Sequence, residues 1–223
     1  MPVKSTPDAA RVRRFRRALL RWFRRRGRDL PWRCTRDPWS ILVSEFMLQQ
    51  TQVPRVTKYY DRFLTRFPTA AHAARAPAAA VREAWDGLGY YRRAADLHRL
   101  AVAVEDRHRS VIPDDVERLR ALPGVGEYTA GAVACFAFEQ AVPAIDTNVE
   151  RVLRRAFHPR LGRGAAASRR LRASAQRLLP RNGPTAWAMN QGLMELGALV
   201  CTARVAHCPR CPVRNQCRTG AAR

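Results

Sequence analysis

Acidic residues and lysine are scarce in this chain of 223 residues. Asp and Glu number 18 against 41 Lys and Arg, so the formal net charge is +23. Lys4 and Lys58 are the only lysines, and the positive charge is therefore almost all arginine, whose guanidinium group binds a phosphate through two hydrogen bonds. The hydrophobic content of 47% is too high for a disordered basic tail. The composition predicts a folded protein that binds a polyanion, with nucleic acid as the first candidate.

Long hydrophobic runs are also missing. No stretch of about 18 uncharged apolar residues occurs, so we expect no membrane-spanning helix. The N-terminus lacks the apolar core and the small-residue cleavage site of a secretory signal. Its arginine-rich, acid-poor start would also suit an organellar transit peptide, but Phe15, Leu19 and Trp22 recur at helical spacing and indicate part of the fold. These features predict a cytoplasmic protein.

Signals for β-strands are nearly absent. Successive apolar segments instead repeat every 3.6 residues, and the short breaks between them contain Gly or Pro. No long linker or internal repeat interrupts this pattern, and the Ala-rich stretch 70–80 is also predicted to be helical. We therefore predict an all-α protein, and any two domains must pack closely. The predicted helices cover residues 12–23, 39–50, 52–67, 77–85, 91–107, 114–122, 129–138 and 149–157.

Six cysteines are present, and four of them lie within residues 201–223. In a reducing compartment such cysteines are more often metal ligands or buried thiols than disulfides. The spacing Cys-x6-Cys-x2-Cys-x5-Cys contains one close pair, whereas a zinc ribbon prefers two, so a [4Fe–4S] cluster is the better fit. Cys135 lies in an apolar helix and is expected to be a buried thiol. The candidate ligands are Cys201, Cys208, Cys211 and Cys217.

A glycine-rich turn, Leu122-Pro123-Gly124-Val125-Gly126, joins two of the predicted helices. Its two glycines let the backbone turn tightly, and the N–H groups that open the second helix lie at the positive end of the helix dipole. This pattern predicts a helix-hairpin-helix that holds one DNA phosphate without reading sequence. An ordinary turn between two helices explains the glycines equally well, and the net charge favours the DNA interpretation.

Two carboxylic acids lie in unusual sequence surroundings. Asp146 precedes the helix predicted over 149–157, where it serves as an N-cap or, close to a phosphate-binding hairpin, as a catalytic group. Glu45 interrupts the apolar sequence 41–48, and a carboxyl group in apolar surroundings has a raised pKa and can act as an acid near neutral pH. An exposed position on its helix is the alternative for Glu45, and this segment alone favours neither.

Together, these segments resemble the helix-hairpin-helix DNA glycosylases that carry an iron–sulfur cluster, the superfamily of endonuclease III. Within that superfamily the similarity to the MutY-type adenine DNA glycosylases is closer, and it spans roughly residues 11–217. The segments that carry the resemblance are Leu30-Pro31-Trp32-Arg33, 43–53, Gly87-Leu88-Gly89-Tyr90-Tyr91, the turn 122–126, Thr129-Ala130-Gly131-Ala132 and the cysteine spacing.

The resemblance implies a monofunctional enzyme of base excision repair, which flips adenine paired with guanine or 8-oxoguanine out of the duplex and hydrolyses its N-glycosidic bond. Glu45 matches the acid that protonates the departing adenine, and Asp146 matches the carboxylate that stabilises the oxocarbenium ion. Tyr128 and Asn148 match residues that position the catalytic groups. Gln50, Thr51, Leu88 and Tyr90 match residues that enter the base stack. Gly124 and Gly126 match the hairpin, and Trp32 and Arg33 match part of the adenine pocket.

Tyr128 occupies the position where endonuclease III-like enzymes have a lysine that forms a Schiff base with the DNA. Neither lysine of this chain is near the hairpin in sequence, so we expect little or no lyase activity. Tyr128 also occurs in the related thymine-mismatch glycosylases, so thymine or uracil opposite guanine is the alternative substrate, although Gln49-Gln50-Thr51 favours adenine. A non-catalytic protein that binds damaged DNA is a second alternative, and Glu45 and Asp146 argue against it.

The resemblance also implies a domain organisation. We expect a six-helix barrel domain over 27–138, with the helix-hairpin-helix at about 114–137, and an iron–sulfur cluster domain formed by 1–26 and 139–223. MutY-type enzymes commonly carry a further C-terminal domain that recognises 8-oxoguanine, and only six residues follow Cys217, so we expect a short form without that domain. The expected protein is a bacterial monomer that associates with the nucleoid and binds double-stranded DNA containing a mismatch or a damaged base.

Overall fold

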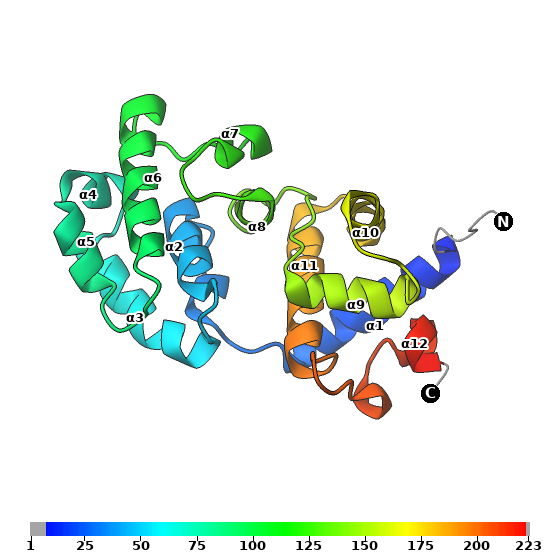
Figure 1. Cartoon of the computed structure of the whole chain (residues 1–223). Coiled ribbons are helices and arrows are strands. Elements are labelled where there is room, and N and C mark those ends of the chain that lie inside the picture. Colours follow the sequence, from blue (N-terminus) through cyan, green and yellow to red (C-terminus); the bar gives the residue numbers. More distant parts are fainter. Residues whose placement is uncertain (1–7, 222–223) are drawn as a thin grey trace. The chain divides into compact units, whose positions relative to one another are not determined.

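The computed structural model describes residues 8–221 (Figure 1). The chain forms two compact units: a central unit, Asp29–Phe138, and a terminal unit that combines the residues up to Arg28 with those from Glu139 onward. Over the described range the structure contains helices, short 3-10 turns and one isolated bridge between Cys201 and Ala206, and no strand, which confirms the all-α prediction. None of the helices within residues 8–221 has the length and apolar character that a membrane span requires.

The central unit is built around α2 and α6. Helix α2 packs against α3, α6 and α8, while α6 packs against α4 and α5. Because α2 is apolar on every side, it is buried along most of its length, and the largest buried side chains of the unit include Trp85, Phe46 and Phe63. The elements of this unit are the 3-10 turn η1 (Pro31–Arg33), α2 (Pro38–Leu48), α3 (Val53–Arg66), α4 (Ala70–Arg75), α5 (Ala78–Ala84), α6 (Arg92–His108), α7 (Val116–Arg120) and α8 (Glu127–Phe136).

The terminal unit joins the N-terminal helix to the C-terminal half of the chain. Helix α1 packs against α10 and α11, and α9 packs against α10, α11 and α12. Phe15 and Phe157 meet in the resulting core with ring centroids 5.0 Å apart. The elements are α1 (Ala9–Arg26), α9 (Thr147–Phe157), α10 (Ala165–Leu178), α11 (Gly183–Leu199), η2 (Cys208–Arg210), η3 (Arg214–Gln216) and α12 (Arg218–Ala221).

Local sequence signals determine where several helices begin. Asp37 accepts a hydrogen bond from the backbone N–H of Ser40 at 2.7 Å, and Pro38 occupies the first position of α2, where its missing N–H is not needed. Asn182 caps α11 in the same way through the N–H of Thr185 at 3.0 Å. These side chains satisfy N–H groups that have no partner inside the helix.

The prediction of a continuous helix over the Ala-rich stretch 70–80 is wrong. Helix α4 ends at Arg75 and α5 begins at Ala78. Between them Pro77 has no N–H to donate and restricts the preceding Ala76, which is extended with φ −76° and ψ 149°. Helix α7 is also shorter than the predicted 114–122, because Asp115 caps it and the helix starts at Val116.

Candidate active site

Four of the residues matched to the base stack line one groove of the central unit. Gln50 and Thr51 follow α2, and Leu88 and Tyr90 lie in the loop between α5 and α6. The groove measures about 1150 Å³ when the space open to solvent is counted. Its other lining residues are Gln52, Pro54, Arg55, Lys58 and Tyr59. A groove that combines cations with aromatic rings is suited to a nucleic-acid strand.

The two loops that line this groove together with α3 have strained backbones. Gln50 has a φ of 56° and Tyr90 a φ of 48°, in the left-handed region that residues other than glycine rarely adopt. Gly87 has a φ of 90°, and a Cβ atom there would lie 2.1 Å from the hydroxyl oxygen of Tyr59. Tyr90 is 59% exposed and Leu88 only 3%, so Tyr90 is the side chain that this conformation offers for stacking on a base.

Arg93, at the start of α6, holds the two loops together. Its guanidinium group is buried and donates to one hydroxyl and five backbone carbonyl oxygens: Thr51 Oγ1 (3.0 Å), Phe46 (3.0 Å), Met47 (2.8 Å), Leu88 (3.4 Å), Gly89 (3.1 Å) and Gln49. Several of these carbonyls end α2, where no partner exists inside the helix and the dipole favours a cation. The rings of Trp85 and Tyr90 lie 5.5 and 5.2 Å from the guanidinium carbon. Burial lowers the pKa of Arg93, and the neighbouring Tyr90 partly opposes this effect.

Glu45 lies inside the central unit. It is 4% exposed on α2 and is flanked by Ser44 and Phe46, which are each 1% exposed. The alternative that placed Glu45 on the exposed face of its helix is therefore wrong. Trp32, in η1, is also buried and packs edge-on against Tyr60 with ring centroids 5.5 Å apart, while the adjacent Arg33 is partly exposed.

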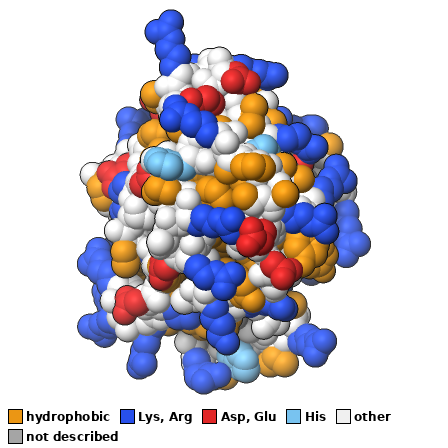
Figure 2. Space-filling view, turned by 90° about the vertical axis from the view of Figure 1, so that its left-hand side faces the viewer, with side chains coloured by type: hydrophobic (Ala, Val, Ile, Leu, Met, Phe, Trp, Pro, Cys, Tyr) orange, Lys and Arg blue, Asp and Glu red, His pale blue; other side chains and the backbone are white. Residues whose placement is uncertain are grey.

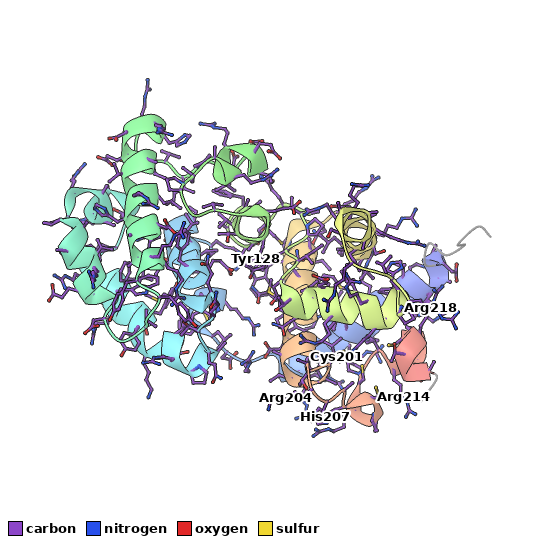
Figure 3. The ribbon with its side chains drawn as sticks, viewed as in Figure 1. Tyr128, Cys201, Arg204, His207, Arg214 and Arg218 are labelled. Carbon is purple, nitrogen blue, oxygen red and sulfur yellow. The ribbon has the colours of Figure 1, made fainter. Side chains whose placement is uncertain are left out.

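The predicted hairpin consists of α7, a tight turn and α8, and its two helices pack against each other. Gly124 has a φ of 74°, and a Cβ atom there would lie 2.9 Å from both Asp96 Cβ and Phe46 Cε1. Gly126 is the N-cap of α8 with a φ of −87°, and a Cβ atom there would meet nothing within 4 Å. Gly124 is thus required by packing and backbone conformation, whereas Gly126 leaves open space before the N-terminus of α8. Tyr128 projects from the first turn of α8 (Figure 3).

These two glycines are expected to respond differently to substitution by alanine. Gly124→Ala should lower the free energy of unfolding by about 2 kcal/mol, because the added methyl group meets both strain and close neighbours. Gly126→Ala should keep the free energy of unfolding within about 0.5 kcal/mol and weaken duplex binding about tenfold, since the methyl group obstructs the amide groups of α8. Urea unfolding and fluorescence anisotropy measure the two effects. Equal losses of stability in the two variants would contradict this assignment.

Asp146 begins a chain of hydrogen bonds at the start of α9. Its Oδ1 atom accepts from the backbone N–H of Val149 at 2.7 Å, which makes it the N-cap, and its Oδ2 atom accepts from the side-chain amide of Asn148 at 2.8 Å. Asn148 Oδ1 accepts from Arg151 Nη2 at 2.7 Å, and Arg151 Nε donates to the carbonyl oxygen of Cys201 at 2.8 Å. Both oxygens of the carboxylate are therefore oriented, and a continuous network connects Asp146 to the first of the four C-terminal cysteines.

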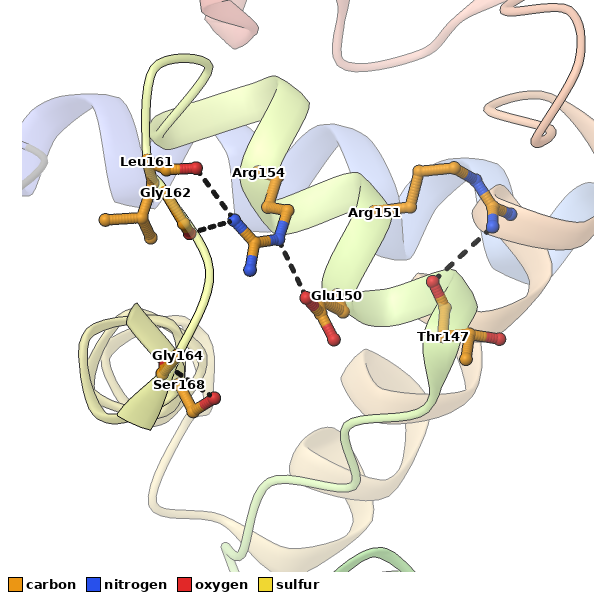
Figure 4. Close-up of polar contacts among 8 residues, drawn as sticks. All are labelled: Thr147, Glu150, Arg151, Arg154, Leu161, Gly162, Gly164 and Ser168. Carbon is orange, nitrogen blue, oxygen red and sulfur yellow. Dashed lines mark hydrogen bonds and ion pairs between the residues drawn. The ribbon is translucent and has the colours of Figure 1, made fainter. Parts of the chain in front are cut away.

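Gly197 of α11 allows this network to form. A Cβ atom at Gly197 would lie 2.6 Å from Asn148 Cβ, so only glycine lets the two helices approach this closely. The carbonyl oxygen of Gly197 also accepts from Arg151 Nη2 at 2.8 Å. Arg151 reaches back to the carbonyl oxygen of Thr147 at 3.4 Å as well (Figure 4). Arg151 therefore contacts both α9, which carries Asn148, and α11, which packs against it.

A second arginine of α9 holds the loop that leads to α10 (Figure 4). Arg154 Nε pairs with Glu150 Oε1 at 2.7 Å, and Arg154 Nη1 donates to the carbonyl oxygens of Leu161 and Gly162 at 2.9 and 2.8 Å. At the start of α10 the Ser168 hydroxyl donates to the carbonyl oxygen of Gly164 at 3.3 Å. Part of the high arginine content thus stabilises loops rather than facing a partner.

All four C-terminal cysteines line one cavity of about 330 Å³, counting space open to solvent: Cys201, Cys208, Cys211 and Cys217. Within residues 8–221 no three His, Cys, Asp or Glu side chains converge closely enough to hold one metal ion. In a [4Fe–4S] cluster each thiolate binds a different iron, so four sulfurs spaced around a cavity fit that group better than a single zinc ion. Burial raises the pKa of Cys211 to about 11 and also raises the pKa of Cys217. Iron ions bound to the sulfurs would lower both pKa values, because positive charge favours the thiolate form.

Arginines from other elements hold the cysteine loop, residues 201–217. Arg155 Nη1 donates to Cys201 Sγ at 3.4 Å and to the carbonyl oxygen of Thr202 at 2.7 Å. Arg11 Nε, on α1, donates to the carbonyl oxygen of Gln216 at 2.7 Å. Figure 3 labels three further residues of this loop, Arg204, His207 and Arg214, and Arg218 directly after it. The loop is thus fastened at both ends to the helices of the terminal unit.

Sequence patterns did not identify Arg93, Gly197 or the pair formed by Arg28 and Glu195. Glu195 is fully buried on α11, and its two carboxylate oxygens accept from Arg28 Nε at 2.7 Å and Nη2 at 2.9 Å. The hydrogen bond to Glu195 raises the pKa of Arg28. An acid inside an apolar helical segment is the signal that singled out Glu45, and the same signal applies to Glu195. No local signal distinguishes Arg93 from the adjacent Arg92.

Comparison with known proteins places the chain in a family. The HhH-GPD superfamily of base excision DNA repair proteins matches residues 43–181. A protein of Mycobacterium tuberculosis named adenine DNA glycosylase is 51% identical over 196 residues, and the match covers 87% of this chain and 64% of the relative. A thymine-DNA glycosylase of Aeropyrum pernix is 37% identical over 217 residues, and the match covers 94% of this chain and 96% of the relative. The solved structure of a thermostable thymine-DNA glycosylase superposes with a TM-score of 0.87 at 29% identity, covering 97% of this chain and 100% of the other.

The chain therefore spans slightly less than two thirds of the mycobacterial relative and nearly all of the archaeal one. The family match includes Glu45, the groove, the hairpin and Asp146. Since the match covers more than half of the chain, the chain belongs to the HhH-GPD superfamily of base excision DNA repair proteins.

Proposed function

We propose that this chain is a monofunctional DNA glycosylase that removes adenine paired with guanine or 8-oxoguanine. The observation that carries the proposal is the burial of Glu45 on the helix that ends beside the groove. A buried carboxylic acid is suited to donating a proton at neutral pH. The identity of 51% with a protein named adenine DNA glycosylase supports adenine as the base.

In the proposed reaction Glu45 donates a proton to a ring nitrogen of the flipped adenine. The electrons of the N-glycosidic bond then pass to the base, which leaves as neutral adenine, and positive charge develops on the deoxyribose. The anionic Asp146 stabilises this oxocarbenium ion, and water adds to C1′ while its proton passes to a carboxylate, which leaves an abasic site. Asn148, which donates to Asp146, orients that carboxylate, and Tyr128 is the other positioning residue.

The remaining site residues are proposed to bind double-stranded DNA, with the protein acting as a monomer. Gln50, Thr51, Leu88 and Tyr90 fill the gap that the flipped base leaves. The N-terminus of α8, opened by Gly126, holds one phosphate, and Gly124 maintains the turn. Trp32 and Arg33 form part of the wall around adenine.

We propose that the four C-terminal cysteines bind a [4Fe–4S] cluster: Cys201, Cys208, Cys211 and Cys217. When bound, the cluster supplies a rigid covalent cross-link between segments of the cysteine loop. Arg155 and Arg11 fasten that loop to α9 and α1, and Arg151 links Cys201 to Asn148. The role assigned to the cluster is therefore structural.

Thymine or uracil opposite guanine is the second candidate substrate. The observation that favours it is the match to the Aeropyrum pernix thymine-DNA glycosylase, of which this chain covers 96%, together with the TM-score of 0.87 to a solved thymine-DNA glycosylase. Tyr128 in the central unit does not favour either substrate, since it is compatible with both. The segment Gln49-Gln50-Thr51 favours adenine.

A single-turnover assay on duplexes containing A:8-oxoguanine, A:G, T:G or U:G tests the proposal. We expect release of adenine from the first two duplexes. Release of thymine alone would assign the second candidate, and release of no base would indicate a non-catalytic DNA-binding protein.

With borohydride in the same assay we expect no efficient covalent adduct, because Tyr128 stands at the lysine position. If an adduct forms, its loss in Lys58→Arg would identify the groove lysine as its source.

A further inference from the structure

Helix α1 has two faces of opposite character. Its apolar side chains, including Phe15 and Leu19, are buried in the core of the terminal unit. On the opposite side six exposed arginines fall within about 120° of the helix circumference and extend along about 18 Å of its axis. This arginine stripe consists of Arg13, Arg14, Arg17, Arg21, Arg24 and Arg25.

The arginine stripe has no structural role within the described part of the chain. None of its six side chains forms a hydrogen bond, ion pair or ring contact there, and α1 contains no Asp or Glu. Other arginines of α1 do stabilise the fold: Arg11 donates to the carbonyl oxygen of Ala156 at 2.8 Å, and Arg16 donates to that of Leu178 at 3.0 Å. Like charges three or four residues apart destabilise a helix by about 0.2–0.5 kcal/mol per pair, so helix stability does not explain the stripe.

The surface of the central unit near α4 and α5 differs from the stripe. There, acidic side chains lie among the arginines (Figure 2). Arg66 pairs with Glu83 at 2.8 Å, and Arg75 pairs with Glu105 at 2.9 Å. Arginine on that surface is locally neutralised, whereas the positive charge of the stripe has no counter-charge on its own helix.

The chemistry of the stripe identifies its partner. A helix that lies on a membrane inserts its apolar face, but here that face is already buried in the protein core. The energetic centres of protein–protein interfaces combine arginine with buried tryptophan or tyrosine, and the stripe contains no aromatic side chain. An extended row of guanidinium groups instead matches the regularly spaced phosphates of a double helix, with which arginine forms two hydrogen bonds at once.

We propose that the arginine stripe binds the phosphate backbone of duplex DNA, independently of sequence and as a contact additional to the groove and the hairpin. This inference goes beyond base excision and requires only that duplex DNA be the partner. By lengthening each encounter with undamaged DNA, the contact would assist the search for rare mismatches.

Salt-dependent binding to undamaged DNA tests the proposal. The variant combines Arg13→Gln, Arg17→Gln and Arg24→Gln, and its matched control combines Arg66→Gln, Arg75→Gln and Arg99→Gln, which removes the same charge from arginines that already have carboxylate partners. Fluorescence anisotropy with a duplex of about 30 base pairs gives the slope of log K against log salt, which changes by about 0.9 per phosphate contact. The slope is negative, and we expect its magnitude to decrease by about 2 to 3 in the stripe variant and by less than about 1 in the control.

Equal slopes for the stripe variant and its control would overturn the proposal. So would unchanged DNA binding accompanied by lost binding to vesicles of an anionic phospholipid, which would assign the stripe to a membrane surface. Arg17→Gln alone, with an expected change in slope of about 1, serves if the triple variant does not fold. Base excision is measured separately on the unsubstituted protein, so failure of the proposed activity and failure of the stripe give different results.

Discussion

Glu45→Gln is expected to reduce the single-turnover rate of base excision about a thousandfold, within the range that general acid catalysis contributes. The glutamine amide has nearly the same shape as the carboxyl group, but its N–H protons are not acidic enough to be transferred to the leaving base. Because the substitution retains the size of a side chain that is 4% exposed, the fold and the DNA-binding groove should persist. The measurement is the rate of product formation with enzyme in excess, together with the dissociation constant for the same duplex.

The control for this experiment is Glu83→Gln. Glu83 lies on the surface of α5 and pairs with Arg66, outside the groove and the hairpin. Its substitution should leave the excision rate within about twofold, since surface ion pairs contribute little. If Glu45→Gln retained a tenth or more of the unsubstituted rate, Glu45 would not be the proton donor, and the assignment of Asp146 would need to be tested in the same way.

Arg93→Met is expected to lower the free energy of unfolding by about 3 kcal/mol and to weaken DNA binding as well. Methionine fills the same space, but it leaves the carbonyl groups at the end of α2 and in the loop 88–89 without their donor, and each unsatisfied buried group costs about 1–3 kcal/mol. Because Arg93 also contacts the ring of Tyr90, its loss should release the loop that presents this residue to DNA. Urea unfolding followed by circular dichroism measures the first effect, and anisotropy with duplex DNA measures the second.

Arg92→Met is the matched control for Arg93. The two residues are adjacent on α6, but the side chain of Arg92 is 91% exposed and lies 3.9 Å from Asp96. Its substitution should change the free energy of unfolding by less than about 0.5 kcal/mol. Arg93→Lys retains the charge and some of the hydrogen bonds, so its stability should be intermediate. Similar losses in the methionine variants at 92 and 93 would show that charge, rather than the hydrogen bonds of Arg93, stabilises the loops.

Features encoded within a few residues could be predicted from the sequence. Apolar residues at helical spacing identified most helices, and Asp37-Pro38 marked the start of α2. The paired glycines predicted a tight turn between two helices, and the structure places that turn between α7 and α8, with close neighbours around Gly124 and open space beside Gly126. The Ala-rich stretch misled the prediction, since the effect of Pro77 on Ala76 outweighed the helix propensity of alanine.

The sequence by itself determined the all-α class, the cysteine spacing and the shortage of lysine, because composition and local pattern do not depend on distant contacts. Tertiary structure alone decided which side chains are buried. Arg92 and Arg93 are indistinguishable in sequence, yet only Arg93 is enclosed by α2 and two loops. Likewise the six arginines of the stripe resemble Arg11 and Arg16 in sequence, and only packing assigns the latter two to backbone carbonyls. Burial and pairing depend on residues far apart in the chain, so these roles emerge only when the helices pack.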